Sequence, residues 1–518
     1  MMRHTTICGG NIRKATSRGT MAALMGTALL LTAVACAAQQ TSSQQADSQI
    51  GVFPLTTYSP EARRLVEESL EQGFDRLERA EQIELLRKAL QIDPEFAIAH
   101  QFLVLASLDS AEQVREQEKA FATRSHASPA EQLAIDWFQD AADQKLMSAV
   151  PKMNTLLHQY SRDKWVVWMA ILWLTRQTQY DHAIAVFERS GITNSPGLTN
   201  HMGYANARIR QFDKAFVLMD RYAAMMPNEA NPQDSYGEIS LLAGRFDQAI
   251  EHFRAALAIN PQFYASQFGI ADTYSLIGDE VRARQEYEIG FQKFSSPELQ
   301  QIKWRTREAT TFIRESDYEN AGHAFQAIAD YARSRQNSRA EADTYRQMAL
   351  YQQNPKHALV FLDKAEAATQ ESKNTQKIAT EQELAQILRA RVDVALKMDM
   401  KKMAVSNLAQ LAEMSKTSND KQIEVEYHGA AGAVLFSEHK YDEAISHLEE
   451  DPDNPFSLRL LAFAYQKIGY SAGARRTSDI LANFNEPTLE QALVVPAFRK
   501  CYDTPACSGN AKAASLRP

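Results

Sequence analysis

The sequence predicts an all-α protein made of stacked antiparallel helix pairs, and two observations support that prediction. The segment RFDQAIEHFRAALAINP at 245–261 repeats the pattern of QFDKAFVLMDRYAAMMP at 211–227, with Phe, Asp, Ala and the final Pro at matching places. Each segment has apolar residues at helical spacing, and a fixed period of about 34 residues is typical of repeat architectures. The chain of 518 residues is 45% hydrophobic and 23% charged, which fits a folded protein with an ample core.

The amino terminus is not expected to belong to this fold. Four basic residues come first: Arg3, Arg13, Lys14 and Arg18. An apolar run then starts at Met21 and ends in small residues, and it is shorter than the about 20 apolar residues that a membrane anchor needs. A basic flank followed by such a run is typical of an export signal, so we predict a signal peptide over 1–35.

Two cleavage sites are compatible with this leader. The segment TAVAC, Thr32–Cys36, resembles the lipobox of bacterial lipoproteins, in which the cysteine receives the lipid, although Leu is usual where Ala33 stands. The alternative is cleavage at ACA by ordinary signal peptidase, which would leave a soluble periplasmic protein.

The residues after Cys36 suit the lipoprotein alternative. The stretch QQTSSQQADS at 39–48 is polar and unpatterned, so we predict a flexible tether over 36–58. Because Ala37 is not acidic, we expect an outer-membrane lipoprotein facing the periplasm.

The repeat can be defined by five positions, Gly237, Ala249, Phe253, Ala256 and Pro261. The same spacing is found one period earlier at Gly203, Ala215 and Pro227, and one period later at Ala271, Ala283, Tyr287 and Gly290. Small residues let neighbouring helices approach closely, and the aromatic residue lies one turn from Ala249 on the same face, where it fills the gap. Proline ends one helix pair and precedes the next.

This period with these residues resembles the tetratricopeptide repeat, which implies an α-solenoid of antiparallel helix pairs forming a right-handed superhelix. The segment 227–263, with Asn-Pro followed by Asp-Ser-x-Gly-Glu, is similar to the repeat module found behind bacterial winged-helix activators, adenylate cyclases and Ser/Thr kinases, and so is 127–138. The resemblance covers roughly 65–295. It implies a sensing or docking module without the catalytic or DNA-binding heads of those families.

Weaker copies extend the pattern in both directions. Their key alanines are Ala183, Ala321, Ala358, Ala404, Ala444 and Ala474. From Ala183 to Ala283 the key alanines keep nearly the same period, whereas beyond Ala283 the intervals are uneven and most of them are longer. We therefore predict regular repeats over 59–296 and less regular helical repeats over 297–500.

Three local segments refine this division. SSPEL, Ser295–Leu299, fits a joint with Ser296 as the cap of a new helix, and SPAE, Ser128–Glu131, fits a capping box at another helix start. The aromatic run WVVWMAILWL at 165–174 is too short to span a membrane and is predicted to be a buried first helix of a pair.

The last two cysteines, Cys501 and Cys507, lie in KCYDTPACSG. In an oxidising envelope they fit a small disulfide within a disordered tail over 501–518, and the alternative is two free thiols. No metal site is expected, since the two cysteines alone do not complete a tetrahedral set.

We expect no enzymatic activity and no cofactor. The chain contains no H-E-x-x-H, no G-x-x-x-x-G-K-[ST] and no G-x-S-x-G. The net charge of −8 argues against nucleic acid as a partner, because nucleic-acid binding needs a basic surface.

The resemblance implies a partner-binding groove lined by the first helix of each pair. Aligning the pattern gives the candidates Asn200, Tyr204, Arg208, Asn231, Asp234, Glu238, Phe268, Asp272 and Leu276. Some tetratricopeptide proteins clamp a peptide's terminal carboxylate on this face with Lys, Asn and Arg. Here Tyr204, Asp234 and Asp272 stand at the clamp positions, and an acidic groove would repel a carboxylate.

These features favour an exported, lipid-anchored scaffold or adaptor in the bacterial cell envelope that docks a protein or peptide partner and is attached to the membrane through Cys36. Two alternatives stay open. One is a periplasmic sensor that binds a small ligand within the superhelix, which a deep apolar pocket beneath the Trp165–Trp173 cluster would favour. The other is an accessory subunit of an envelope enzyme.

Overall fold

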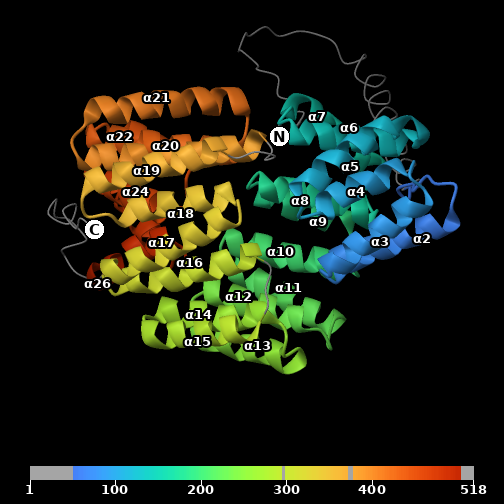
Figure 1. Cartoon of the computed structure of the whole chain (residues 1–518), viewed down its shortest axis with the longest axis horizontal. Helices are drawn as coiled ribbons and strands as arrows, with labels where there is room; N and C mark the ends of the chain where they lie inside the picture. Colours follow the sequence, from blue (N-terminus) through green and yellow to red (C-terminus); the bar gives the residue numbers. More distant parts are fainter. Residues whose placement is uncertain (1–50, 295–297, 372–376, 503–518) are drawn as a thin grey trace, which may run out of the picture. The chain divides into compact units, whose positions relative to one another are not determined.

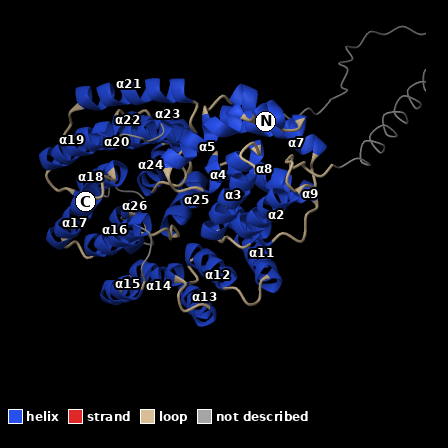
Figure 2. Cartoon of the chain, turned by 45° about the vertical axis from the view of Figure 1, so that its right-hand side comes forward, coloured by secondary structure: helices blue, strands red, loops and turns tan. Residues whose placement is uncertain are grey.

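The computed structural model describes residues 51–294, 298–371 and 377–502 (Figure 1). Within these ranges every regular element is helical: 25 α-helices, one short π-helix and one short 3-10 helix, with no strand (Figure 2). The predicted all-α fold is therefore confirmed.

The first fourteen α-helices form seven consecutive pairs. Their bounds are α2 (Pro60–Leu70), α3 (Arg79–Ile92), α4 (Ala97–Ala106), α5 (Ser110–Ala122), α6 (Pro129–Ala142), α7 (Leu146–Gln159), α8 (Lys164–Arg176), α9 (Tyr180–Ser190), α10 (Pro196–Arg208), α11 (Phe212–Met225), α12 (Ala230–Leu242), α13 (Phe246–Ile259), α14 (Tyr264–Ile277) and α15 (Glu280–Lys293). The two helices of each pair pack on each other, and the first helices α10, α12 and α14 also pack side by side. This is the stacking that a solenoid requires.

Phe253 explains why the repeat needs glycine and alanine at fixed positions. A β-carbon added to Gly237 on α12 would lie 2.7 Å from the Phe253 ring, and one added to Gly269 on α14 would lie 2.6 Å from it. Ala249 and Ala256, on the same helix as Phe253, have no exposed surface. The ring from α13 thus fills the space between two first helices, as the sequence predicts for Gly237, Ala249 and Phe253.

The turn inside each of five pairs contains one residue in the left-handed conformation. These residues are Gln144, Thr178, Arg210, Gly244 and Gly278, with φ of 56°, 54°, 60°, 74° and 95°. They recur with nearly the same period as the key alanines, so the backbone repeats as regularly as the side chains. Only two of the five are glycine, although glycine adopts this conformation at the lowest cost.

The predicted capping box is confirmed at the start of α6. Ser128 accepts a hydrogen bond from the Glu131 N–H, and the Glu131 carboxylate accepts one from the Ser128 N–H at 2.9 Å. The same buried carboxylate also accepts the Thr56 N–H at 2.8 Å. Nearby, the Phe53 N–H donates to Asp163 at 2.9 Å, and the Phe53 ring is 3% exposed.

These contacts show that the folded part of the chain begins earlier than predicted. The sequence places all of 36–58 in the tether, whereas the compact unit begins at Val52. Phe53 and Leu55 are buried and hold 52–58 against the helices.

The aromatic run at 165–174 belongs to α8, a buried first helix as predicted. Asp163 caps it by accepting the N–H groups of Trp165 and Val166 at 3.0 and 3.2 Å. In the described ranges, no helix is both long enough and apolar enough to cross a membrane.

The second half of the chain contains longer helices. Their bounds are α16 (Glu298–Arg314), α17 (Tyr318–Ser334), α18 (Ser338–Tyr351), α19 (Pro355–Glu371), α20 (Lys377–Lys397), α21 (Lys401–Ser418), α22 (Lys421–Ser437), α23 (Tyr441–Leu448), α24 (Pro455–Lys467), α25 (Ser471–Ala482) and α26 (Leu489–Cys501). Helix α20 has 21 residues, against 13 or 14 in the middle repeats, which explains the wider spacing of the key alanines. The predicted joint at Ser296 and Pro297 lies outside the described residues.

Helix α26 packs on α16 and α24, so the helix at Leu489–Cys501 contacts the start of the second half of the chain.

Arg389 on α20 links three first helices, α20, α22 and α24. It pairs with Glu426 on α22 at 3.0 Å and with Asp451, just before α24, at 2.6 Å, and it donates to the Ser457 hydroxyl on α24 at 3.0 Å.

A second long-range junction involves the π-helix η1 (Glu71–Asp75). Asp75 accepts the Ser195 hydroxyl at 2.7 Å and the Gly197 N–H at 3.2 Å, and it pairs with Lys164 at 3.0 Å. A β-carbon at Gly197 would lie only 1.7 Å from the Phe74 carbonyl oxygen. The first turn of α10 therefore sits directly against the backbone of η1.

Candidate partner-binding surface

The predicted groove residues come from α10, α12 and α14, three first helices that pack side by side. Asn200, Tyr204 and Arg208 are successive i+4 positions on α10, and the other candidates follow similar spacing on the next two helices. Residues four apart share one side of a helix, so each helix contributes a row of side chains.

Several of these candidates are buried rather than open to a partner. Phe268 is 1% and Leu276 is 4% exposed, and both belong to the hydrophobic core between α13, α14 and α15. The Phe268 ring lies 5.0 Å from that of Trp304 on α16, and a β-carbon on Gly290 would touch it. The prediction that Phe268 and Leu276 line a groove is therefore wrong. Asn200 is also buried.

The remaining candidates join neighbouring repeats to one another. The Tyr204 hydroxyl on α10 donates to the Glu238 carboxylate on α12. The Ser266 hydroxyl on α14 donates to Asp234 on α12 at 2.6 Å. Each link connects the first helix of one repeat to the first helix of the next.

The next link in this series introduces basic residues that the pattern alignment missed. Asp272 on α14 accepts a hydrogen bond from the Tyr287 hydroxyl and pairs with Arg307 on α16. Lys303 stands one turn before Arg307, is exposed, and lies 3.9 Å from the centre of the Trp304 ring. No repeat pattern indicates Lys303 and Arg307, because the spacing changes at the start of α16.

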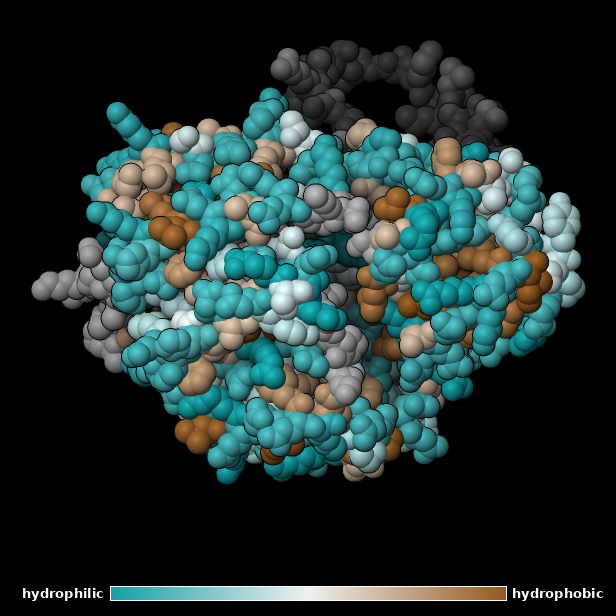
Figure 3. Space-filling view, in the orientation of Figure 1, coloured by the Kyte–Doolittle hydropathy of each residue, from teal (hydrophilic) through white to brown (hydrophobic). Residues whose placement is uncertain are grey.

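We call the solvent-reaching side chains of these helices the first-helix face; they are Tyr204, Arg208, Asn231, Glu238, Lys303 and Arg307. This face carries both signs of charge, so the expectation of an acidic groove is not met. The side of the molecule seen in Figure 3 is likewise largely hydrophilic, with hydrophobic residues in small separate groups.

Burial changes the protonation of the groups behind this face. Burial, with the nearby Glu238 charge, raises the pKa of Asp234 to about 8, although the Ser266 hydrogen bond and Lys303 oppose the shift. Burial and Glu238 also raise the pKa of Tyr204 well above its ordinary value. Partial loss of hydration around its ammonium group, together with the nearby positive charge of Arg307, lowers the pKa of Lys303 to about 8. Near pH 7 Asp234 is therefore mostly neutral, whereas Lys303 stays mostly protonated.

This pKa shift predicts how Asp234 affects stability. Between about pH 4 and pH 8 folded Asp234 holds a proton that the unfolded chain releases, so its contribution to the free energy of unfolding falls as pH rises. Replacing Asp234 with Asn keeps an acceptor for Ser266 and removes this loss. We expect Asp234→Asn to gain several kcal/mol over the wild type at pH 9, at about 1.4 kcal/mol for each pKa unit of the shift, and close to nothing at pH 4.

The measurement is denaturant unfolding of both proteins at the two pH values. Glu229→Gln, an exposed neighbour at the start of α12, controls for the loss of one carboxylate. An equal effect of Asp234→Asn at both pH values would contradict the shifted titration.

Part of the candidate groove already holds a segment of the same chain. Arg208 pairs with Glu486, and Arg210 donates to the Ile480 carbonyl at 3.3 Å. The Asn485 amide donates to the Leu242 carbonyl at the end of α12 at 3.2 Å. Residues 484–488 are not helical and connect α25 to α26. These partners lie 243 to 278 residues apart, and no sequence spacing indicates them.

The other predicted sites lie largely beyond the described residues. The lipidation candidate Cys36 and the disulfide candidate Cys507 are both outside them, and Cys501 ends α26. Lipidation and the Cys501–Cys507 disulfide therefore stay predictions. In the described ranges no group of three or more His, Cys, Asp or Glu residues is placed to hold a metal ion.

A family model supports the repeat assignment for part of the chain. The tetratricopeptide repeat family model matches residues 240–303. No curated protein matches the chain in sequence. Among solved structures, the crystal structure of the APC/C hetero-tetramer Cut9–Hcn1 is similar at 14% identity over 78% of this chain and 76% of that chain, with a TM-score of 0.33. The crystal structure of yeast Tom70 is similar at 13% identity over 88% of this chain and 99% of that chain, with a TM-score of 0.38.

Proposed function

We propose that this chain, a tetratricopeptide repeat protein, is a scaffold that docks a protein or peptide partner on its first-helix face. Stacked helix pairs present a continuous surface built from equivalent positions of successive helices. An extended peptide or a partner helix can follow such a surface and contact several repeats at once.

The observation that carries this proposal is the segment 484–488, a non-helical connection held against α10 and α12. Its Glu486 side chain pairs with Arg208, and its Asn485 amide reaches a backbone carbonyl at the end of α12. Side chain and backbone groups of these helices thus contact a non-helical piece of polypeptide through one carboxylate and one amide. The neighbouring part of the face, with Tyr204, Glu238 and Lys303, is still accessible to solvent.

Reversing one charge on the open part of the face tests the proposal. Glu238 is exposed and lies on α12, so Glu238→Lys changes the sign of charge at the proposed docking site. Because Glu238 also accepts the Tyr204 hydroxyl, thermal melting of the variant checks that the fold is kept. We expect recovery of a stoichiometric partner from envelope extract to fall about tenfold, because mispaired charges at an interface are costly. The readout is quantitative co-purification followed by mass spectrometry.

Glu251→Lys is the matched control, because Glu251 is equally exposed but lies on α13, a second helix. Co-purification with Glu251→Lys should equal that of the wild type. If both variants lose the partner, or neither does, the first-helix face is not the docking surface.

We further propose that the scaffold works in the bacterial cell envelope, attached to the membrane by a lipid on Cys36. The support is the basic and apolar leader followed by TAVAC and a polar tether. In this arrangement the lipid would hold the docking face close to the membrane.

Replacing Cys36 with Ser is expected to move the protein from the membrane fraction to the soluble periplasmic fraction, since the thiol that would accept the lipid is gone. The measurement is immunoblotting of fractionated cells, with Cys501→Ser as a control that should stay with the membrane. Unchanged membrane association of Cys36→Ser would contradict lipidation at this residue.

A further inference from the structure

A cavity of about 250 Å³ lies between η1, α3, α4, α8 and α10, and we call it the arginine cavity. It adjoins Trp168, where the sequence suggests a pocket for a small ligand, and most of the residues that line it are apolar. Two of them are arginines, Arg79 and Arg176, and none of the described lining residues is Asp or Glu. The volume is below the about 300–1,000 Å³ of sites for drug-sized molecules, so the cavity suits a smaller ligand.

The two arginines have no anionic partner in the described part of the chain. Neither Arg79 nor Arg176 forms an ion pair or a side-chain hydrogen bond with a described residue. Both side chains contact solvent, so a ligand can reach them. Part of the Arg176 side chain is nevertheless buried, which lowers its pKa, and the nearby positive charge of Arg79 lowers the pKa further. The two cations therefore repel each other within one cavity.

Arg176 differs from the other described arginines whose pKa is lowered by burial. Arg314 and Arg459 each lie near a carboxylate, and Arg210 and Arg499 donate to backbone carbonyl groups. A positive charge in partly dehydrated surroundings needs such a partner. In the arginine cavity the described chain supplies none, so an anion from outside would complete the site.

Two neutral polar side chains, Gln82 and His201, complete the lining. Gln82 is 4% exposed, and its side chain makes no hydrogen bond with a described residue. Its amide packs so closely on Gly73 that a β-carbon there would overlap it, yet the amide is not enclosed by protein and stays open to the cavity. Burial lowers the pKa of His201 to about 4, so its ring is neutral near pH 7 and keeps one N–H. Buried polar groups are nearly always paired, so the amide of Gln82 is a further donor for a ligand.

The rest of the lining supplies apolar surface. The Phe74 and Trp168 rings stack with their centres 3.8 Å apart, and Leu105 and Leu172, which also line the cavity, are half-buried. Leu77, in the turn before α3, is 38% exposed. A ligand with an apolar body would remove this surface from water, whereas a bare inorganic anion would leave it hydrated. The lining therefore suits an anion that carries an apolar group.

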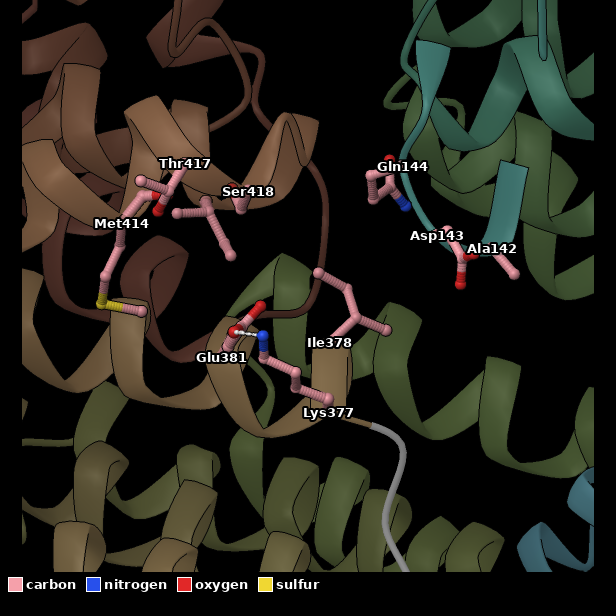
Figure 4. Close-up of a pocket in the computed structure, with 10 residues that line it drawn as sticks. Ala142, Asp143, Gln144, Lys377, Ile378, Glu381, Met414, Thr417 and Ser418 are labelled. Carbon is pink, nitrogen blue, oxygen red and sulfur yellow. Dashed lines mark hydrogen bonds and ion pairs between the residues drawn. The ribbon is translucent and has the colours of Figure 1, made fainter. Parts of the chain in front are cut away.

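A larger cleft, of about 550 Å³, has a different arrangement of charges. In Figure 4, Asp143 lies on one side of it and Lys377 and Glu381 on the other, with Lys377 paired to Glu381 at 3.4 Å. Asp143 pairs with Lys145 at 2.8 Å. Each described charged residue that lines this cleft thus has a partner of opposite sign, which the arginines of the arginine cavity do not have.

We propose that the arginine cavity binds a small organic anion, in which a carboxylate or phosphate group is joined to an apolar body such as a single ring. Guanidinium groups pair with both oxyanions through parallel N–H donors, and the charge of the ligand would relieve the repulsion between Arg79 and Arg176. The cavity shares no residue with the first-helix face, so the proposal does not rest on the docking function.

Isothermal titration calorimetry of the purified full chain tests the proposal, with benzoate, hexanoate and phenyl phosphate as probes. At least one of these anions should bind saturably. Benzamide and hexanamide keep the shape of the two acids without the charge, and inorganic phosphate keeps the charge without the apolar body. We expect each of these three compounds to bind at least about tenfold more weakly than the matching anion, since it lacks one of the two kinds of contact.

Arg176→Gln and Arg79→Gln each remove one positive charge and keep a polar side chain. Because neither arginine has a partner among the described residues, both variants should fold, which thermal melting checks. We expect each variant to bind the anion about 10- to 100-fold more weakly than the wild type, as for the loss of a hydrogen bond to a charged group.

Arg63→Gln is the matched control. Arg63 lies on α2, is exposed and has no ion pair with a described residue, as for the two cavity arginines, but it does not line the cavity. This variant loses the same charge and should bind the anion like the wild type.

Three results would overturn the proposal. The first is that none of the three anions binds to the wild type. The second is that a neutral amide binds as tightly as its acid, or inorganic phosphate as tightly as phenyl phosphate, because the site would then not select an anion with an apolar body. The third is that Arg176→Gln and Arg79→Gln bind the anion as well as Arg63→Gln does.

Discussion

Replacing Arg389 with Met is expected to lower the free energy of unfolding by about 3–5 kcal/mol. Arg389 is 7% exposed, and Asp451, to which it is paired, is 2% exposed. Methionine fills most of the same volume but leaves the carboxylates of Asp451 and Glu426 without their cation. An unpaired buried charge is far more costly than an absent ion pair, so the loss is large.

The same variant should be less impaired in acid. Burial raises the pKa of Glu426, and Arg389 counteracts that shift. Without the guanidinium the folded protein takes up a proton at a higher pH than the unfolded chain does, so its stability falls as pH rises above about 4.5. Denaturant unfolding at pH 5 and pH 8 measures the difference between the two proteins.

Arg391→Met on the same helix is the matched control. Arg391 pairs with Asp363 and Glu366, whose side chains are 66% and 34% exposed. Ion pairs of that kind contribute about 1 kcal/mol or less. If Arg391→Met and Arg389→Met cost the same, the buried cluster is not what holds α20, α22 and α24 together.

Replacing Gly197 with Ala is expected to cost about 3 kcal/mol or more, an unusually large effect for one methyl group. The new β-carbon would stand 1.7 Å from the Phe74 carbonyl oxygen, and a backbone atom cannot rotate away as a side chain can. Moving α10 away from η1 would also weaken the hydrogen bonds that Asp75 accepts from Ser195 and from the Gly197 N–H.

Gly322→Ala provides the contrast, measured by thermal and denaturant unfolding. Gly322 lies within α17, and nothing stands within 4 Å of the position that its β-carbon would take. Alanine stabilises a helix interior relative to glycine by roughly 0.5–1 kcal/mol, so this variant should be slightly more stable than the wild type. A Gly197→Ala protein as stable as wild type would show that α10 and η1 are not in direct contact.

The sequence predicts those parts of the fold in which the same local side-chain contacts recur from repeat to repeat. Glycine at 237, alanine at 249 and phenylalanine at 253 recur at a fixed period because each helix pair meets its neighbour in the same way. The left-handed turn residues recur with the same period, yet Gln144, Thr178 and Arg210 carry no glycine signal there. The regular geometry of the pair imposes that conformation, so residue type alone does not reveal it.

The groove is harder to predict because a row of i+4 residues drifts around its helix. Each step of four residues turns about 400°, so the two steps along a row of three residues rotate its direction by about 80°. On α10 the row passes from buried Asn200 through half-buried Tyr204 to exposed Arg208. On α14 the row stays buried, since α16 covers it as well. The contacts of Arg208 with Glu486 and of α26 with α16 join segments that lie far apart in the sequence. They depend on how the last helices fold back on the middle of the chain, which we call its closure.

That closure affects how the protein loses its structure. In a simple linear array each repeat touches only its neighbours, so the ends can fray one repeat at a time. Here α26 packs on α16, and residues 480–486 contact α10 and the end of α12. The carboxyl-terminal repeats therefore cannot unfold without losing their contacts with the middle of the chain. Unfolding of the last repeats by force or heat would therefore also break the contacts at Arg208. We expect the helical stack to unfold cooperatively, as a globular domain does.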